Sequence, residues 1–340
     1  MAEFNPNEAA VKNGNYFGFP YTTEEADIVL VSIPWDVTTS YKPGTSNGPE
    51  AMINASVQLD FFDFDLEEAW NMKIATLPID ESIKHENAHY RKLAGVVIEQ
   101  LESGHANPEI VRNNLEQVNL GSKALNQKVY DTTLTLLKQG KITGLVGGDH
   151  STPLGYMQAL GKLHDNFGIL HIDAHADLRF AYEGFEFSHA SIMNNALKIK
   201  SVSKLVQVGI RDFCNEEMQI AQSDKRIRQF HDQKLAEQLF EGACWDELCN
   251  DIVASLPEKV YISFDIDGLS PEYCPNTGTP VPGGLSYNQA IHLLRKVAKS
   301  GKQIIGFDLN EVAPGNNEWD ANVGSRVLFK LCCLTVASKK

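Results

Sequence analysis

The chain alternates short apolar runs with longer stretches in which apolar residues recur every three or four positions. The short runs are rich in β-branched residues, which is typical of strands that are buried on both faces of a sheet. They cover residues 26–35, 142–147, 167–172, 205–210, 260–264 and 303–307. The longer stretches have the period of an amphipathic helix, and they cover residues 126–138, 153–163, 236–256 and 287–299. A repeated order of strand, helix and strand predicts an α/β fold with a parallel sheet covered by helices on both faces.

No Pro/Ser-rich or single-charge linker divides the 340 residues, so we expect one domain that covers residues 1–340. Between residues 81 and 139 the pattern is mostly helical and polar, with a break where Pro108 fits the first turn of a second helix. We interpret this stretch as a helical excursion of the same domain. Its histidines lack carboxylates at ligand spacing and are expected to be plain surface residues: His85, His89 and His105.

Four of the predicted strands are followed by acids and histidines. In an open parallel sheet, ligands bind just beyond the carboxyl ends of the strands. Alternate residues of an extended segment point to one side. We therefore expect Asp173, His175 and Asp177 to share one space, and Asp265 and Asp267 to do the same. The four segments are Gly148-Asp149-His150-Ser151, Asp173-Ala174-His175-Ala176-Asp177, Asp265-Ile266-Asp267 and Asp308-Leu309-Asn310-Glu311.

The predicted cluster combines two imidazoles, His150 and His175, with four carboxylates. Roughly four negative charges in one pocket cannot stay ionised together without compensating cations, and two divalent ions would supply them. For Asp149 or Ser151 taken alone, capping of the helix that begins near Pro153 is the simpler interpretation. Oxygen-rich ligation with two histidines favours Mn(II), while the imidazoles also allow Ni(II), Co(II), Fe(II) and Zn(II). Two such ions make a nucleophile from water at neutral pH, which predicts a hydrolase without a covalent enzyme intermediate.

Charge and cysteine usage narrow the range of partners. The formal net charge of -14 disfavours nucleic acid and anionic membrane surfaces, and it favours small cationic ligands. None of the six cysteines forms a C-x-x-C pair, so we expect free thiols. The first residues lack the apolar run of a secretory signal, and no stretch approaches the length of a membrane span. These features predict a cytoplasmic protein.

Four motifs resemble those of the ureohydrolases, the family of arginase, agmatinase, guanidinobutyrase, proclavaminate amidinohydrolase and formiminoglutamase. They are GGDHS at 147–151, DAHAD at 173–177, SFDIDGLSP at 263–271 and GFDLNEVAP at 306–314. The resemblance runs from about residue 40 to residue 334, and SYKPGTSNGPEAM at 40–52 is similar to the agmatinase-type segment. It implies a three-layer arginase-like fold, with a central parallel sheet of about eight strands flanked by helices. It also implies a homo-oligomer, either a trimer or a hexamer.

The resemblance assigns roles to the candidate residues. It implies two Mn(II) per chain, with Ni(II) or Co(II) as alternatives, and Asp173 and Asp265 would bridge the two ions. Glu311 matches the carboxylate that grips the substrate guanidinium, and His189 matches the histidine that transfers protons near the leaving amine. One ion would be held by His150, Asp173, Asp177 and Asp265, and the other by Asp173, His175, Asp265 and Asp267. Four other histidines are expected to be surface or packing residues: His164, His171, His231 and His292.

The implied activity is agmatinase-like hydrolysis of a C–N bond in a small cationic guanidino or amidino compound, a linear amidine, with release of urea and an amine. Arginine is disfavoured, because Leu178 to Gly184 replace the Asn and the small hydroxylic residues of arginase. Many agmatinases have paired arginines where this chain has Asn194 and Asn195, which leaves guanidine, guanidino acids and formiminoglutamate open. Two other classes are a non-catalytic metal-binding protein, which would not need His189 and Glu311, and a deacetylase-like hydrolase with one zinc.

Overall fold

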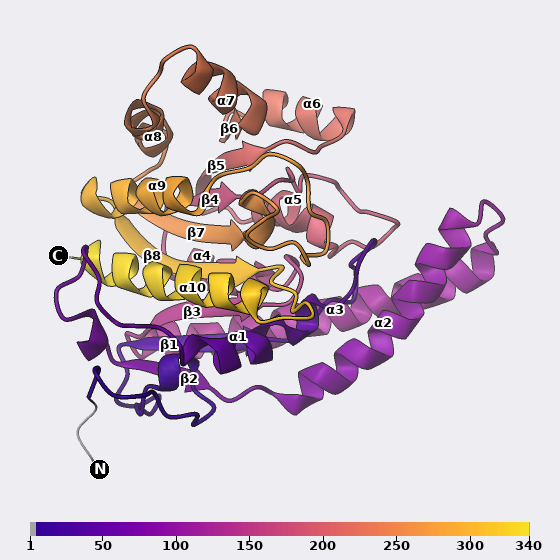
Figure 1. The fold of residues 1–340 in the computed structure, drawn as a ribbon. Coiled ribbons are helices and arrows are strands. Elements are labelled where there is room, and N and C mark those ends of the chain that lie inside the picture. The colour runs from indigo at the N-terminus through magenta and orange to yellow at the C-terminus, as the bar shows by residue number, and fades with distance from the viewer. Residues whose placement is uncertain (1–4, 340) are drawn as a thin grey trace.

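The computed structural model describes residues 5–339, in which eight strands form one parallel sheet (Figure 1). The order across the sheet is β2-β1-β3-β8-β7-β4-β5-β6. The parallel sheet of eight strands confirms the predicted fold class. The strands are β1 Ile28–Ile33, β2 Ile74–Leu77, β3 Ile142–Gly147, β4 Phe167–Ile172, β5 Val202–Ile210, β6 Ile227–His231, β7 Lys259–Asp265 and β8 Gln303–Asn310.

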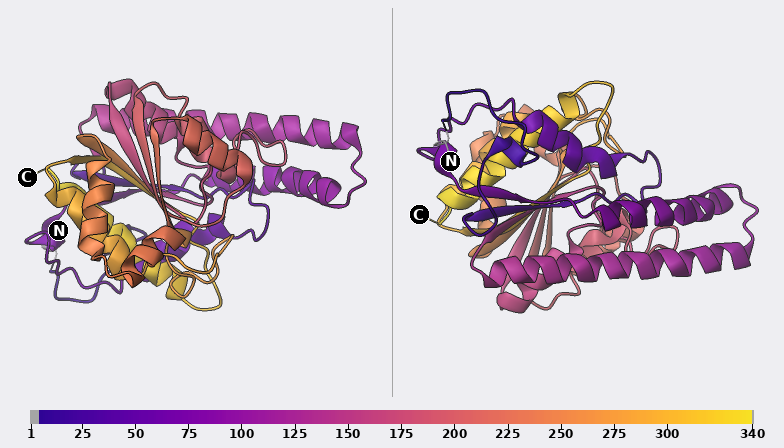
Figure 2. Two further views of the ribbon diagram at one scale, coloured as in Figure 1. Left: turned by 90° about the horizontal axis from the view of Figure 1, so that it is seen from above. Right: turned by 90° about the horizontal axis from the view of Figure 1, so that it is seen from below.

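Helices cover both faces of the sheet, as Figure 2 shows from two sides. On β1, Ile28 and Leu30 belong to one apolar core, while Val29 and Val31 belong to the core on the opposite face. The first core is closed by α1 Gly48–Ser56, α8 Trp245–Ala254, α9 Tyr287–Lys299 and α10 Trp319–Ala337. The second is closed by α2 Glu81–Glu102, α3 Pro108–Lys138, α4 Leu154–Leu163 and α5 Ile192–Ala196. Two further helices, α6 Asn215–Ser223 and α7 Asp232–Phe240, follow β5 and β6.

The expected single helix over residues 236–256 is wrong. The chain forms α7 and α8 there, and between them Gly242 adopts a φ of +102°, which glycine tolerates and other residues rarely do. The two strands that the apolar pattern missed, β2 and β6, lie at the two edges of the sheet. Both are short and only partly buried, so they lack the continuous apolar run of the central strands.

Helices α2 and α3 form a hairpin that projects beyond the rest of the described chain (Figures 1 and 2). The side chain of Asp80 caps α2 by accepting from Ser82 N, and that of Asn107 caps α3, whose first residue is Pro108. The three histidines of this stretch are exposed, as expected. All six cysteines are free thiols, and no described helix is long and apolar enough to cross a membrane.

Candidate metal centre

The candidate site lies at the carboxyl ends of four strands that are neighbours in the sheet, β3, β8, β7 and β4. His150 follows β3, Glu311 follows β8, Asp265 ends β7, and Asp173 follows β4. Because these strands are adjacent and parallel, their ends bring the four residues together although more than 160 positions separate His150 from Glu311. The six expected ligand side chains therefore occupy one region of the molecule.

The ring of His150 is oriented by a hydrogen-bond chain on its far side. Ser263 Oγ donates its proton to Asp308 Oδ1 at 3.0 Å. The lone pairs of Ser263 Oγ can therefore accept a hydrogen bond from His150 Nε2, which is 2.9 Å away. This arrangement turns His150 Nδ1 toward the acids. Metal-ligating histidines are commonly fixed in this way by a hydrogen bond from the other ring nitrogen.

Three carboxylates converge on His150 Nδ1. Their nearest oxygens lie at 3.0 Å for Asp173, 3.1 Å for Asp265 and 3.5 Å for Asp177. One ring nitrogen carries at most one proton and cannot satisfy three buried carboxylates. Burial by itself lowers the pKa of His150, but the neighbouring carboxylates of Asp173 and Asp265 raise that pKa well above its usual range. The cluster therefore requires positive charge at this point, and the donor set fits a metal ion.

A second set of groups lies beside the first. His175 Nδ1 is 3.1 Å from Asp267 Oδ2 and 3.4 Å from Asp173 Oδ1. The other carboxylate oxygens are held by backbone amides, since Asp267 Oδ1 accepts from Ala174 N and Asp265 Oδ1 from Asp267 N. These amides leave one oxygen of each acid directed into the cluster. Asp173 lies between His150 and His175, with one oxygen near each ring.

The acids of the cluster oppose one another electrostatically. Burial and the neighbouring carboxylate of Asp173 raise the pKa of Asp177 well above its usual range. Burial, Asp267 and Asp173 do the same to the pKa of Asp265. A bound divalent cation would stabilise the ionised form of these carboxyl groups.

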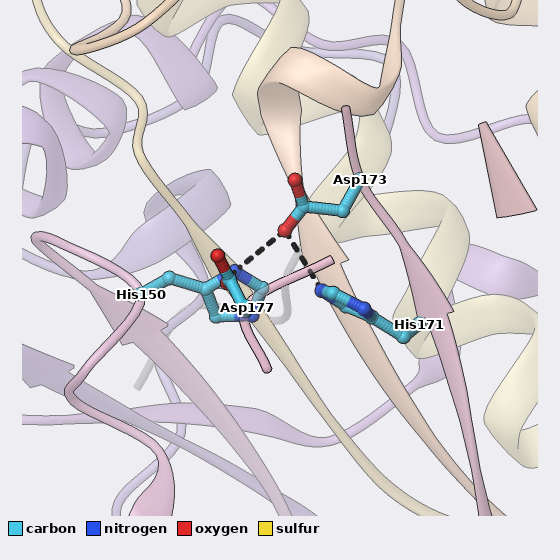
Figure 3. Close-up of side chains that lie close together, drawn as sticks. All are labelled: His150, His171, Asp173 and Asp177. Carbon is cyan, nitrogen blue, oxygen red and sulfur yellow. Dashed lines mark hydrogen bonds and ion pairs between the residues drawn. The ribbon is translucent and has the colours of Figure 1, made fainter. Parts of the chain in front are cut away.

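His171 contradicts our expectation of a surface or packing residue. It is buried on β4, where its Nε2 lies 2.7 Å from Asp173 Oδ2, and its Nδ1 accepts from Gln207 Nε2 at 2.9 Å. Figure 3 shows the ring of His171 pointing at Asp173, on the side away from Asp177. Because both ring nitrogens are engaged, His171 supports the carboxylate of Asp173. His171 stands two positions before Asp173, and this strand spacing is a signal that could have revealed it.

Glu311 lies next to the cluster and is incompletely paired. Its Oε1 accepts from His150 N at 3.0 Å, while its Oε2 is buried without a hydrogen-bond partner among the described residues. Burial, Asp265 and Asp149 raise the pKa of Glu311 well above its usual range. Its φ of 64° is uncommon for a non-glycine residue and is typical of functional sites. A cation placed at Oε2 would relieve both the missing partner and the repulsion.

His189 begins a short 3-10 helix, His189–Ser191, at the mouth of the site. It lines a cavity of about 150 Å³ together with His175, Asp177, Arg179 and Tyr182. Burial, followed by the positive charges of His175 and His150, lowers the pKa of His189 to about 3. The imidazole is therefore neutral at neutral pH.

Asp149 does not cap α4, which was the simpler interpretation from the sequence. The N-terminal residue of that helix has no side-chain cap. Asp149 is instead fully buried and accepts from Ser151 N, Ser151 Oγ and the hydroxyl of Thr38. The sequence offers no reason to expect Thr38 at the site. Its hydroxyl contacts His189, and nothing in the local sequence pattern indicates that contact.

The chain is similar to known proteins over most of its length. The sequence profile of the Arginase family matches residues 26–333. An N(1)-aminopropylagmatine ureohydrolase of Thermus thermophilus is 33% identical over 304 residues, which cover 89% of this chain and 87% of that protein. The agmatinase of Bacillus subtilis is 26% identical and 91% of each chain is covered. The structure of proclavaminate amidino hydrolase from Streptomyces clavuligerus has a TM-score of 0.72 at 21% identity, with 98% of this chain and 100% of that chain covered. The chain belongs to the arginase family.

Proposed function

We propose that this protein is an agmatinase-like ureohydrolase, a metal-dependent enzyme that hydrolyses a guanidino C–N bond and releases urea and an amine. It is a hydrolase of non-peptide C–N bonds in linear amidines. The observation that carries this function is the position of Glu311 Oε2, which has no hydrogen-bond partner among the described residues, beside a buried cluster of acids and imidazoles. A metal-binding protein without catalysis would have no use for such a carboxylate.

Two divalent ions would be held by the clustered side chains, with Asp173 and Asp265 shared between them. The converging oxygens support this assignment, and Mn(II) suits an oxygen-rich set with two imidazoles better than Ni(II) or Co(II). When bound, the ions supply Lewis acidity and a nucleophile from water at neutral pH. His150, Asp173, Asp177 and Asp265 would hold the first ion, and Asp173, His175, Asp265 and Asp267 the second.

Glu311 and His189 would act on the substrate. A planar guanidinium pairs with a carboxylate through two N–H donors, and Glu311 Oε2 needs a donor of this kind. Binding there orients the central carbon toward the cluster. His189 lines the cavity at the mouth of the site together with His175 and Asp177, and an imidazole there would transfer a proton to the amine nitrogen as that group leaves.

The preferred substrate would be agmatine or a longer compound with the same guanidino end. The similarity to relatives named agmatinase and N(1)-aminopropylagmatine ureohydrolase supports this choice. Guanidine, guanidino acids and formiminoglutamate are secondary candidates. The loop of residues 178–184 lacks the small hydroxylic residues, Ser and Thr, that would hold an amino acid head group.

The family resemblance also supports a single domain over residues 1–340 and a homo-oligomer, either a trimer or a hexamer. The six free thiols favour the cytoplasm. The formal charge of -14 favours a cationic substrate over nucleic acid or membrane partners.

A substrate panel tests the proposed function. Purified protein loaded with Mn(II), and separately with Ni(II), is incubated with agmatine, aminopropylagmatine, guanidine, 4-guanidinobutyrate, arginine and formiminoglutamate. We expect urea from agmatine or aminopropylagmatine at the highest kcat/KM. Absence of urea with every guanidino compound and both metals would contradict the function.

A further inference from the structure

A buried hydroxyl connects His189 to the body of the protein. Thr38 lies in the loop that follows β1, and it is fully buried. Its Oγ1 accepts from the backbone N–H of His189 at 3.2 Å and lies 3.5 Å from His189 Nδ1, the same distance as Ser188 Oγ. The Thr38 hydroxyl therefore contacts both the backbone and the ring of His189.

The orientation of this hydroxyl is set by Asp149. The Thr38 hydroxyl lies 3.2 Å from Asp149 Oδ2, and Thr38 N lies 3.4 Å from the same oxygen. An ionised carboxylate only accepts hydrogen bonds, so the hydroxyl proton of Thr38 points at Asp149. The lone pairs of Oγ1 are then left to face His189. Asp149 is rigid in turn, because Ser151 donates to its other oxygen through both N and Oγ.

Helix α2 holds the backbone on both sides of Thr38 in the sequence. Arg91 Nη1 donates to the carbonyl oxygens of Val37 and Thr39, the two residues that flank Thr38. One helical turn earlier, Asn87 and Asp36 form a reciprocal pair, with Asp36 N donating to Asn87 Oδ1 at 2.8 Å and Asn87 Nδ2 to Asp36 Oδ1 at 3.0 Å. The base of the α2–α3 hairpin thus fixes the backbone of residues 36–39.

We propose that Thr38 is a positioning residue for His189, aimed by Asp149 and held in place by Arg91 of α2. The inference rests on the proposed function, in which His189 transfers a proton at the mouth of the site. Proton transfer requires hydrogen-bond reach between donor and acceptor, and a shift of about 1 Å in a reacting group costs about 10²-fold in rate. The α2–α3 hairpin acquires a role through this contact, because it fixes a wall of the site.

Two substitutions at one position separate the hydroxyl from the volume of the side chain. Thr38→Val is close in size but removes the oxygen, whereas Thr38→Ser keeps the oxygen. We expect Thr38→Val to lower kcat by roughly 10- to 100-fold, with unchanged KM and unchanged metal content. Thr38→Ser should stay within about threefold of the wild type. Thermal melting checks that both variants fold, and Arg91→Met, which changes no residue at the site, should lower kcat in the same direction.

A double variant shows whether Thr38 acts through His189. His189→Ala should keep its metal ions and lose about 10²- to 10⁴-fold in turnover. Adding Thr38→Val to it should cost less than about threefold more, since coupled residues are not additive. An additive loss, a normal kcat in Thr38→Val, or loss of metal in that variant would overturn the positioning role while the proposed function stands. A wild-type enzyme that releases no urea, or a fully active His189→Ala, would overturn the proposed function and this inference together.

Discussion

Individual residues in the centre are directed by partners outside it. Ser263 and Asp308 turn His150 Nδ1 toward the acids, and backbone amides turn one oxygen of Asp265 and Asp267 in the same direction. His150, Asp265 and Asp267 are therefore preorganised by hydrogen bonds that do not depend on an ion. Such partners commonly influence metal affinity nearly as much as the ligands do.

Replacing Asp265 by Asn tests the shared role of this acid. The amide oxygen lacks the negative charge needed to hold two cations, so we expect both metal ions to be lost and activity to vanish. Metal content of the purified protein is measured by elemental analysis. Asp251→Asn, at an exposed position of α8, is the matched control and should retain two ions. An Asp265→Asn protein with two ions and normal turnover would refute the assignment.

His171→Ala should weaken metal binding without removing a ligand. The substitution deletes the hydrogen bond to Asp173 Oδ2, and loss of such a partner typically costs 10- to 100-fold in metal affinity. Competition with a chelator measures the change in dissociation constant. The exposed His105→Ala serves as the control. An unchanged affinity would show that Asp173 needs no support from His171.

The candidate ligands were predictable from the sequence, while their supporting partners mostly were not. The spacing of Asp173, His175 and Asp177 alone predicts their convergence, although Asp177 adopts a φ of 54° and the segment is not extended throughout. His171 has the same spacing from Asp173, but the family resemblance gives it no catalytic role, and for this reason a surface or packing residue is expected there from the sequence. Thr38 and Asp149 are 111 positions apart, and no local pattern reveals such a contact.

At the scale of elements, the order of the strands determines which of their ends meet. The hydrophobic pattern predicted six of the eight strands. The predicted ranges of β3 and β4 coincide with the observed ones, and the range predicted for β8 begins at the observed residue but ends earlier. The period does not say which strands are neighbours, because every buried parallel strand has a similar apolar run. Adjacency of β3, β8, β7 and β4 follows only from the structure.

A buried ion-pair cluster fixes the loop before β2 to helices α9 and α10. Asp65 contacts Lys330 and Arg295 at 2.8 Å each and Lys299 at 3.1 Å. Burial by itself raises the pKa of Asp65, but these three cations hold that pKa well below its usual range. A carboxylate with a lowered folded-state pKa stabilises the fold above its unfolded pKa of about 3.9, and this contribution is lost as the pH falls.

Asp65→Asn should therefore destabilise the protein by roughly 1–2 kcal/mol at pH 7, because Arg295 loses its carboxylate partner and Lys330 keeps only Asp63. The difference from the wild type should shrink below about pH 4, where the Asp65 carboxylate of the unfolded chain becomes protonated while that of the folded protein stays ionised. Urea unfolding followed by circular dichroism at pH 7 and pH 3 measures it. The exposed Asp60→Asn is the control. An equal difference at both pH values would contradict the ion-pair explanation.

At the scale of the whole molecule, net charge and the residues that line the cavity influence which substrates bind. The formal charge of -14 attracts guanidinium compounds over long range. The cavity at the mouth, about 150 Å³, is lined by Arg179, Tyr182 and Asp212 among others. Arg179 stacks on Tyr182 and lies 3.7 Å from Glu217. Arg179 is thus already engaged within the protein, and residues 178–184 offer no Ser or Thr hydroxyl to the paired amino and carboxylate groups of an amino acid.

Arginine should be at least about a hundredfold poorer in kcat/KM than agmatine. Its head group would lose water without gaining partners, and unpaired polar groups in a binding site reduce kcat/KM by such factors. Initial rates of urea release with both compounds on one metal-loaded sample measure the ratio. Arginine as the preferred substrate would disprove this view of the mouth.

The central claim is that hydrolysis depends on two ions held by one cluster of acids and imidazoles. Its most direct test is a titration of metal-free protein with Mn(II), in which urea release from agmatine is followed against ions bound per chain. The account predicts activity that rises to a plateau at two ions per chain. Full activity at one ion per chain, or without any metal, would contradict it.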